Sequence, residues 1–250
     1  MTTRRFARTK RSRTRTEDCP PAGSGAGVDA NREPSFLLAG PEKRVLRAIA
    51  ARLPRRVLPD DLTAIGVLSA VGICACYVLS NQDPVWLWAA SALLVVHWLG
   101  DSLDGTLARV RGIGRPRYGY YLDHLVDAVS TAAIGIGLGL SPFMLLSVGT
   151  LIVVGYLVLS INVYLESQAL GRFSIGYGKI GPTEARILLI ALNTALVLGG
   201  GLSFQLAGTD LSVLDLAGIG AVAAMVVMLV TRARRNLREL ALAEPAATRR

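Results

Sequence analysis

Six long apolar stretches constrain the fold of this chain more than any other feature of the sequence. In chain order they are Leu62–Ser80, Val85–Gly100, Tyr120–Leu140, Pro142–Leu165, Ile187–Leu202 and Leu211–Thr231. A helix that crosses the hydrocarbon core of a bilayer needs about 20 mostly apolar residues. The stretches are continuous rather than alternating, which disfavours a transmembrane β-barrel. The sequence therefore predicts an all-α integral membrane protein with six transmembrane helices, and a soluble bundle of buried helices is the alternative.

The basic residues of the chain lie only in certain segments between and beyond these stretches. The chain carries 27 Lys and Arg against 18 Asp and Glu, and all 27 fall before the first stretch, between the second and third, between the fourth and fifth, or after the sixth. Cytoplasmic segments of membrane proteins are enriched in Lys and Arg. We therefore expect a cell-membrane protein with both termini and the two basic loops in the cytoplasm. The net charge of +9 is thereby assigned to topology, and no nucleic-acid partner is predicted.

The ends of the chain are predicted to lie outside the bilayer. Residues 1–40 are basic, polar and rich in Thr, Gly and Pro, and we interpret them as a disordered tail. Residues 41–58 carry apolar side chains at helical spacing among several Arg residues, a pattern typical of an amphipathic helix in the membrane interface that contacts anionic lipids. Residues 59–231 then form the six-span catalytic domain, with Asp60, Asp61 and Thr63 capping its first helix, and residues 232–250 form a basic tail.

Four carboxylates lie where the second and third apolar stretches approach the basic loop between them. Asp101 and Asp104 are three residues apart, and Asp123 and Asp127 are four residues apart. Each spacing places a pair on one helix face, and the two antiparallel helices bring both pairs to one depth. Ligand sets made only of oxygen favour Mg²⁺ or Mn²⁺, and two such ions would form a clamp for a diphosphate. The alternative is interfacial charges that pair with the Arg residues of the loop.

The residues between the two carboxylate pairs add to this interpretation. Gly105 and Ala108 have small side chains that would let a ligand approach the helix backbone, and Arg109 can pair with phosphate. Carboxylates at a membrane edge are by default a functional-site hypothesis.

This segment resembles the signature of the CDP-alcohol phosphotransferases, also called CDP-alcohol phosphatidyltransferases. Eight residues carry the resemblance: Asp101, Asp104, Gly105, Ala108, Arg109, Gly119, Asp123 and Asp127. It implies transfer of a substituted phosphate from a CDP-linked donor, either CDP-diacylglycerol or a CDP-headgroup, to an alcohol or lipid acceptor, with release of CMP in phospholipid biosynthesis. It also implies two divalent cations, Mg²⁺ or Mn²⁺, and a homodimer.

The resemblance also implies a role for each residue of the signature. Asp101, Asp104, Asp123 and Asp127 would be metal ligands, and Gly105, Ala108, Arg109 and Gly119 would surround the CDP moiety. Gly119 would also let the loop turn close to the nucleotide. The acceptor hydroxyl needs a general base, for which Asp127 and the neighbouring His124 are both candidates. An orienting role for His124 is the alternative. The Asp123-His124 pair is more similar to the choline and ethanolamine branch of the family than to its other branches.

A second polar cluster precedes the fifth apolar stretch, on the same predicted side of the membrane. Lys179 and Arg186 could bind the phosphate of an acceptor or a lipid, or they could serve only as positive-inside anchors. Two other functions compete with the CDP-alcohol phosphotransferase. A membrane prenyltransferase also binds Mg²⁺-diphosphate through Asp clusters. Its motif usually continues with another Asp four residues further on, where this chain has Ala108. A non-enzymatic transporter or scaffold with a cation site is the second alternative.

Overall fold

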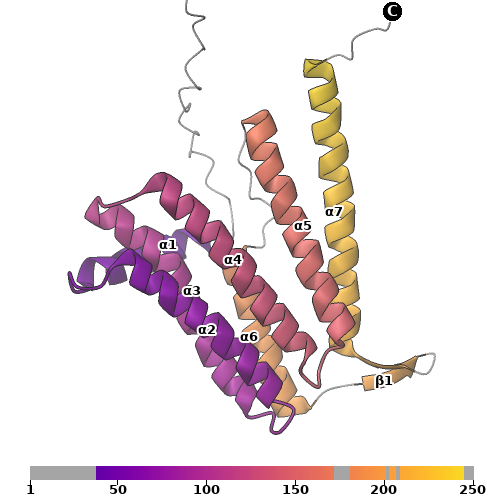
Figure 1. Ribbon diagram of the computed structural model, residues 1–250. Helices are drawn as coiled ribbons and strands as arrows, with labels where there is room; N and C mark the ends of the chain where they lie inside the picture. The colour runs from indigo at the N-terminus through magenta and orange to yellow at the C-terminus, as the bar shows by residue number, and fades with distance from the viewer. Residues whose placement is uncertain (1–37, 172–180, 201–202, 207–208, 245–250) are drawn as a thin grey trace, which may run out of the picture.

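The computed structural model describes residues 38–171, 181–200, 203–206 and 209–244. These residues form seven helices and one antiparallel pair of short strands (Figure 1). In chain order the elements are α1 Ala39–Arg52, α2 Pro59–Leu79, α3 Trp86–Arg111, α4 Pro116–Gly139, α5 Leu146–Leu170, α6 Pro182–Gly199, β1 Ser203–Leu206, β2 Thr209–Ser212 and α7 Val213–Ala243. Residues 1–37 of the predicted disordered tail lie outside the described residues, whereas Ala39 and Gly40 already belong to α1.

Each apolar stretch of the sequence lies largely within one helix. Four of these helices, α2, α5, α6 and α7, are long and apolar enough within the described residues to cross a membrane. Helices α3 and α4 are equally long but contain the Asp pairs and other polar groups, which lower their apolar character. The chain is thus a helical integral membrane protein. Helix α7 runs on to Ala243, so the first part of the basic C-terminal segment is helical.

The helices form two groups that meet through α4. Helix α2 packs against α3 and α4, and α3 also packs against α1 and α6, whereas α5 contacts α4 and α7 (Figure 1). A buried apolar cluster joins the groups at the end of the bundle near the strands, with Tyr77, Leu138, Val148, Leu196 and Leu214 among its members. This end of the molecule is opposite the end that carries the Asp pairs.

A buried polar contact ties α2, α3 and α6 together. Tyr77 Oη donates to Asn193 Oδ1 at 3.2 Å, and Asn193 Nδ2 donates to Ser91 Oγ at 3.2 Å. The side chains of Tyr77 and Asn193 are fully buried. Because an unpaired polar group in an apolar interior is costly, this chain of bonds fixes how the three helices face one another.

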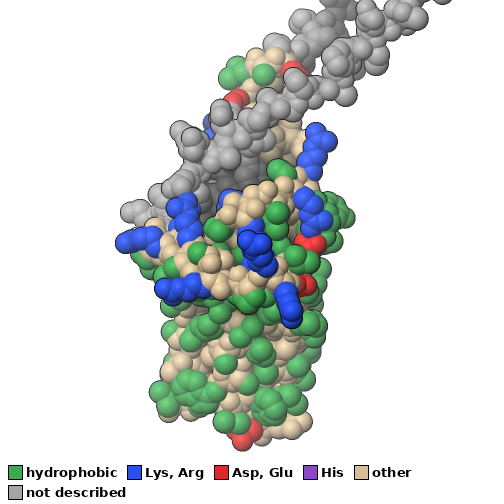
Figure 2. Space-filling model, turned by 90° about the vertical axis from the view of Figure 1, so that its left-hand side faces the viewer, with side chains coloured by type: hydrophobic (Ala, Val, Ile, Leu, Met, Phe, Trp, Pro, Cys, Tyr) green, Lys and Arg blue, Asp and Glu red, His purple; other side chains and the backbone are tan. Residues whose placement is uncertain are grey.

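Helix α1 lies across the other end of this group. Its apolar side, Leu46 and Ala50, packs against Leu62, Leu103 and Leu107 of α2 and α3. Figure 2 shows Lys and Arg side chains gathered above a broad apolar surface, as expected where a membrane protein leaves the hydrocarbon.

Candidate active site

The Asp-bearing end of α3 is positioned by a very close crossing of α2 and α3. A Cβ atom on Gly100 would lie 2.7 Å from the Leu62 carbonyl oxygen and 2.8 Å from the Gly66 backbone nitrogen. Only glycine therefore fits at position 100 without a shift of one helix. Because Asp101 is the next residue, this contact sets the position of the first carboxylate.

Two of the four predicted metal ligands accept hydrogen bonds from other helices, and a third lies near a histidine. Asp101 Oδ2 accepts a hydrogen bond from Arg186 Nη2 of α6 at 2.5 Å, with both side chains largely buried. Asp104 Oδ2 accepts from the Thr63 hydroxyl of α2 at 2.6 Å. Asp123 is half exposed, and its Oδ2 lies 3.7 Å from His124 Nδ1.

Asp127 interacts electrostatically with every other member of the predicted cluster. It is within electrostatic range of Asp101, Asp104 and Asp123, and also of Arg186. The structure thus brings together all four carboxylates that the sequence predicted as a group, and it adds a cation from a distant helix. The charge of Arg186 offsets part of the repulsion among four carboxylates.

The donor set fits hard divalent cations in chemical type, since it consists of carboxylate oxygens from two adjacent helices. As the side chains are placed, no three Asp, Glu, His or Cys side chains in the described part of the chain form a ready metal cage. Oxygen atoms of Asp101 and Asp104 are instead bonded to Arg186 and Thr63. Side-chain rotations would be needed to form the shared coordination that the sequence predicts.

The residues assigned to the CDP moiety flank this cluster. A Cβ on Gly105 would meet only the Arg109 guanidinium, at 3.5 Å, so that side of α3 is accessible to a ligand. Arg109 Nη2 also donates to Thr106 Oγ1 at 3.3 Å, and Ala108 is partly exposed. Gly119 lies inside the first turns of α4, with nothing within 4 Å of a Cβ, so the prediction that it turns the loop is wrong. The left-handed residue of that loop is Gly112, with φ of 66°.

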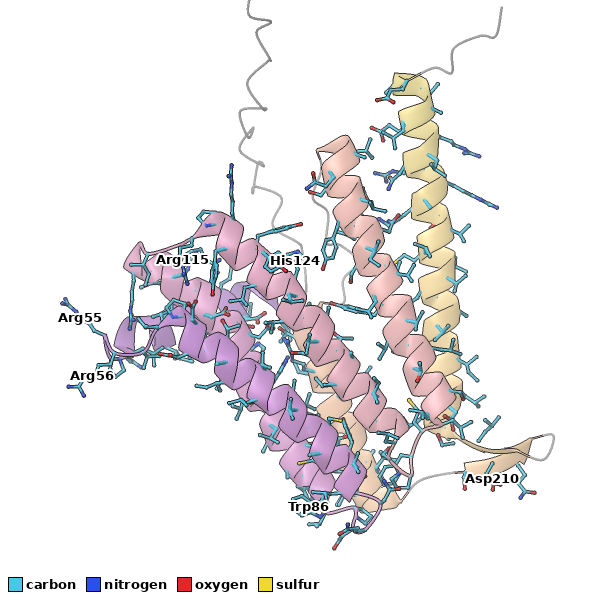
Figure 3. The ribbon with its side chains drawn as sticks, viewed as in Figure 1. Arg55, Arg56, Trp86, Arg115, His124 and Asp210 are labelled. Carbon is cyan, nitrogen blue, oxygen red and sulfur yellow. The ribbon has the colours of Figure 1, made fainter. Side chains whose placement is uncertain are left out.

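His124 occupies an aromatic setting at the edge of the cluster (Figure 3). Its ring centroid lies 4.2 Å from that of Tyr120 and 4.9 Å from that of Tyr164 on α5. The side chain is 18% exposed. These ring contacts connect α4 to α5 beside the carboxylates.

The caps predicted for the first helix take part in other contacts. Only Asp61 caps α2, by accepting from Leu58 N at 2.9 Å. Asp60 forms two hydrogen bonds of 2.7 Å with Arg115 in the α3–α4 loop, and Thr63 contacts Asp104 instead. The prediction of a cap by Asp60 and Thr63 is therefore wrong, because the α3–α4 loop and helix α3 supply these side chains with other partners.

The second predicted cluster contributes one residue to the site. Arg186 lies on α6 against the carboxylates, whereas Lys179 is outside the described residues. Glu184 accepts from Gly181 N at 3.0 Å and so caps α6. The sequence did not predict three contacts of the site: Thr63 with Asp104, Gly100 with the backbone of α2, and His97 with Arg186. Local sequence does not show which face of a helix meets its neighbour.

Comparison with known proteins assigns this arrangement to a class. The family model of the CDP-alcohol phosphatidyltransferases matches residues 56–233. The chain is 30% identical over 144 residues to an archaetidylinositol phosphate synthase of Pyrococcus horikoshii, covering 57% of this chain and 73% of that protein. It is 36% identical over 98 residues to a phosphatidylinositol phosphate synthase of Cutibacterium acnes, covering 39% of this chain and 45% of that protein.

Solved structures show the same fold. The phosphatidylinositol phosphate synthase of Mycobacterium tuberculosis with CDP-DAG bound superimposes with a TM-score of 0.58 at 23% identity, covering 83% of this chain and 98% of that chain. Its complex with manganese and citrate gives a TM-score of 0.54 at 23% identity, covering 84% and 91%.

The chain belongs to the CDP-alcohol phosphatidyltransferase family. It is accordingly a membrane transferase of phospholipid biosynthesis that passes a substituted phosphate from a CDP-linked donor to an alcohol and releases CMP.

Proposed function

We propose that this enzyme takes a CDP-linked lipid of the CDP-diacylglycerol type as donor and an inositol phosphate as acceptor. The observation that carries the proposal is a buried cation, Arg186, at the carboxylate cluster of a chain whose named relatives are inositol phosphate lipid synthases. A phosphorylated acceptor needs a positive group that binds its phosphate beside the carboxylate cluster, and a guanidinium suits a phosphate. These relatives favour the inositol phosphate branch over the choline and ethanolamine branch.

The donor would lie along the exposed side of α3. Gly105 and Ala108 have small side chains there, which would let the donor approach the helix backbone. The Arg109 guanidinium lies over Gly105 and would face the phosphates of the nucleotide. Gly119, on the first turns of α4 with open space around it, would complete the contact surface for the CDP moiety.

The acceptor would approach from the α6 side. Arg186 would bind its phosphate group, with Lys179 as a second cation on the segment that precedes α6. Oriented in this way, the acceptor hydroxyl would meet the phosphorus in line with the departing CMP.

We propose Asp127 as the general base and a positioning role for His124. Asp127 is within electrostatic range of the other three carboxylates and of Arg186, so it would lie near the reacting hydroxyl. His124 is held between two tyrosine rings at the edge of the cluster, which suits fixation of α4 against α5 better than proton transfer. Asp127→Asn should abolish turnover, whereas His124→Phe, which keeps an aromatic ring between the tyrosines, should retain most of it.

The carboxylates Asp101, Asp104, Asp123 and Asp127 would hold two divalent cations, Mg²⁺ or Mn²⁺. When bound, such ions neutralise negative charge on the diphosphate and on the departing CMP. Thr63 would orient Asp104 toward this task through its hydrogen bond of 2.6 Å.

We further propose a six-span topology, in which α3 and α4 also cross the bilayer, with α1 in the interface and a homodimer as the assembly. Both termini and the active site would be cytoplasmic, and the exposed Arg residues of α1 would contact anionic lipids. Arg55 and Asp210 lie at opposite ends of the molecule (Figure 3). With the native cysteines replaced, a cysteine at position 210 but not at position 55 should react with a membrane-impermeant thiol reagent on intact cells.

The substrate proposal is tested by a CMP-release assay on enzyme purified in detergent, with Mg²⁺ or Mn²⁺ and Asp104→Asn as the inactive control. CDP-diacylglycerol is offered with an inositol phosphate, inositol, glycerol 3-phosphate or choline, and CDP-choline is offered with diacylglycerol. CMP release only with CDP-diacylglycerol and the inositol phosphate is expected. Release with another acceptor alone would overturn the substrate proposal, and turnover of a prenyl diphosphate or ion flux without CMP release would favour the alternative functions.

A further inference from the structure

Helix α3 holds the guanidinium of Arg186 at two points. Arg186 Nη2 donates to Asp101 Oδ2 at 2.5 Å, and Arg186 Nε donates to His97 Nδ1 at 3.1 Å. His97 and Asp101 are four residues apart, one helical turn, so both lie on the face of α3 that packs against α6. The guanidinium thus lies along this face, with one edge on His97 and the other toward the carboxylates.

The His97 ring is buried, with 3% of its surface exposed. Its Nδ1 accepts a hydrogen bond, so that nitrogen carries no proton and the neutral ring has its proton on Nε2. The neutral imidazole accepts the Nε–H of Arg186 without neutralising the positive charge of the guanidinium. The carboxylate of Asp101 can therefore remain the only charged partner on α3.

We propose that His97 is a positioning residue for acceptor recognition, which acts by fixing the plane of the Arg186 guanidinium. The inference rests on the proposed function, in which Arg186 binds the acceptor phosphate. An arginine side chain held by one carboxylate alone can turn about that contact, and each productive phosphate contact then costs conformational entropy. With Nε bound to His97, the guanidinium plane is set before the acceptor arrives.

Two amide substitutions separate this role from general packing. The side-chain oxygen of Asn can occupy the position of His Nδ1, whereas the amide of Gln reaches the position of His Nε2. His97→Asn should therefore keep the bond to Arg186, and His97→Gln should lose it, although both place an amide of similar polarity in the same buried position. Tyr77→Phe serves as the matched control. It removes a buried hydrogen bond from α2 to α6, the helix that carries Arg186, at a site far from the carboxylates.

Steady-state kinetics should show a selective loss. His97→Gln should raise KM for the phosphorylated acceptor about 10-fold, the loss expected for a hydrogen bond to a charged group, with KM for the CDP-linked donor within about 2-fold. His97→Asn and Tyr77→Phe should leave both constants close to wild type. In an Arg186→Ala background His97→Gln should have no further effect on the acceptor.

A binding measurement decides the inference without turnover. Inorganic phosphate is titrated into the purified enzyme, and the rise in unfolding temperature is expected to be smaller in His97→Gln than in wild type or His97→Asn. Equal phosphate responses in all three proteins, or equal defects in both amide variants, would overturn the role of His97. Failure of wild type to use an inositol phosphate would refute the proposed function alone, and the phosphate titration would still decide the role of His97.

Discussion

Gly100→Ala is the substitution that tests most directly how the fold positions the carboxylates. The added methyl group would meet backbone atoms only, namely the Leu62 oxygen at 2.7 Å, the Gly66 nitrogen at 2.8 Å and the Gly66 Cα at 3.0 Å. Backbone cannot rotate away as the end of a flexible side chain can. The substitution must therefore move α3 relative to α2 at the residue that precedes Asp101.

The size of the effect follows from these distances. Ordinary contact between such atoms lies near 3.5 Å, so the 2.7 Å approach requires a shift of roughly 0.8 Å. Overpacking of this kind costs about 1–3 kcal/mol of stability. A misplacement of about 1 Å in a catalytic group can lower the rate about 100-fold, so we expect kcat to fall about 10- to 100-fold.

The measurement is CMP release by detergent-purified enzyme, together with its unfolding temperature. Gly66→Ala is an internal comparison, because its Cβ would come no closer than 3.6 Å to any atom, and Gly220→Ala on α7 adds a methyl group in open space. Both should keep kcat within about 3-fold of wild type. A folded Gly100→Ala enzyme with unchanged kcat would refute the argument that this crossing sets the geometry of the site.

Three further substitutions test separate contacts. Thr63→Val removes the hydrogen bond to Asp104 with nearly the same side-chain volume, and we expect CMP release to fall about 10-fold. Thr63→Ser keeps the hydroxyl and should retain activity. Equal rates for both variants would contradict an orienting role for Thr63. Glu42→Ala removes the acceptor of the hydrogen bond of 2.8 Å from Trp98 Nε1, so α1 should detach from α3 more often. Limited proteolysis within residues 38–58 should then be faster. Unchanged cleavage would show that apolar packing alone holds α1 against α3. Gly112→Ala places a side chain at φ of 66° and should cost about 1–2 kcal/mol in a denaturation experiment, and no loss would contradict the left-handed turn.

The sequence contains enough information to predict the helices and the carboxylate cluster, since both depend on local spacing. Apolar runs of bilayer length predict helices, and the spacing of Asp101 with Asp104 and of Asp123 with Asp127 predicts two pairs on facing helices. The family membership confirms the resemblance found in the segment from Asp101 to Asp127. None of these inferences needs the relative rotation of two helices.

The contacts that hold the site depend on such rotations and were missed for that reason. Thr63 was predicted to cap its own helix, yet the face of α2 that meets α3 directs its hydroxyl to Asp104. His97 lies inside the second apolar stretch, and its partner Arg186 lies 89 positions away on α6. Gly100 stands out only once the distance between the two backbones is known.

The same division explains why the sequence left the acceptor alcohol undetermined. The carboxylates and the residues assigned to CDP lie on α3 and α4, which are consecutive in the chain and joined by a short loop. The cation assigned to the acceptor comes from α6 and reaches the cluster only because α6 packs against α3. A change on the α6 side of the cluster could thus alter the acceptor while the α3–α4 carboxylates stay in place. Acceptor preference should accordingly respond to substitutions around Arg186 and His97, with the requirement for a CDP-linked donor unchanged.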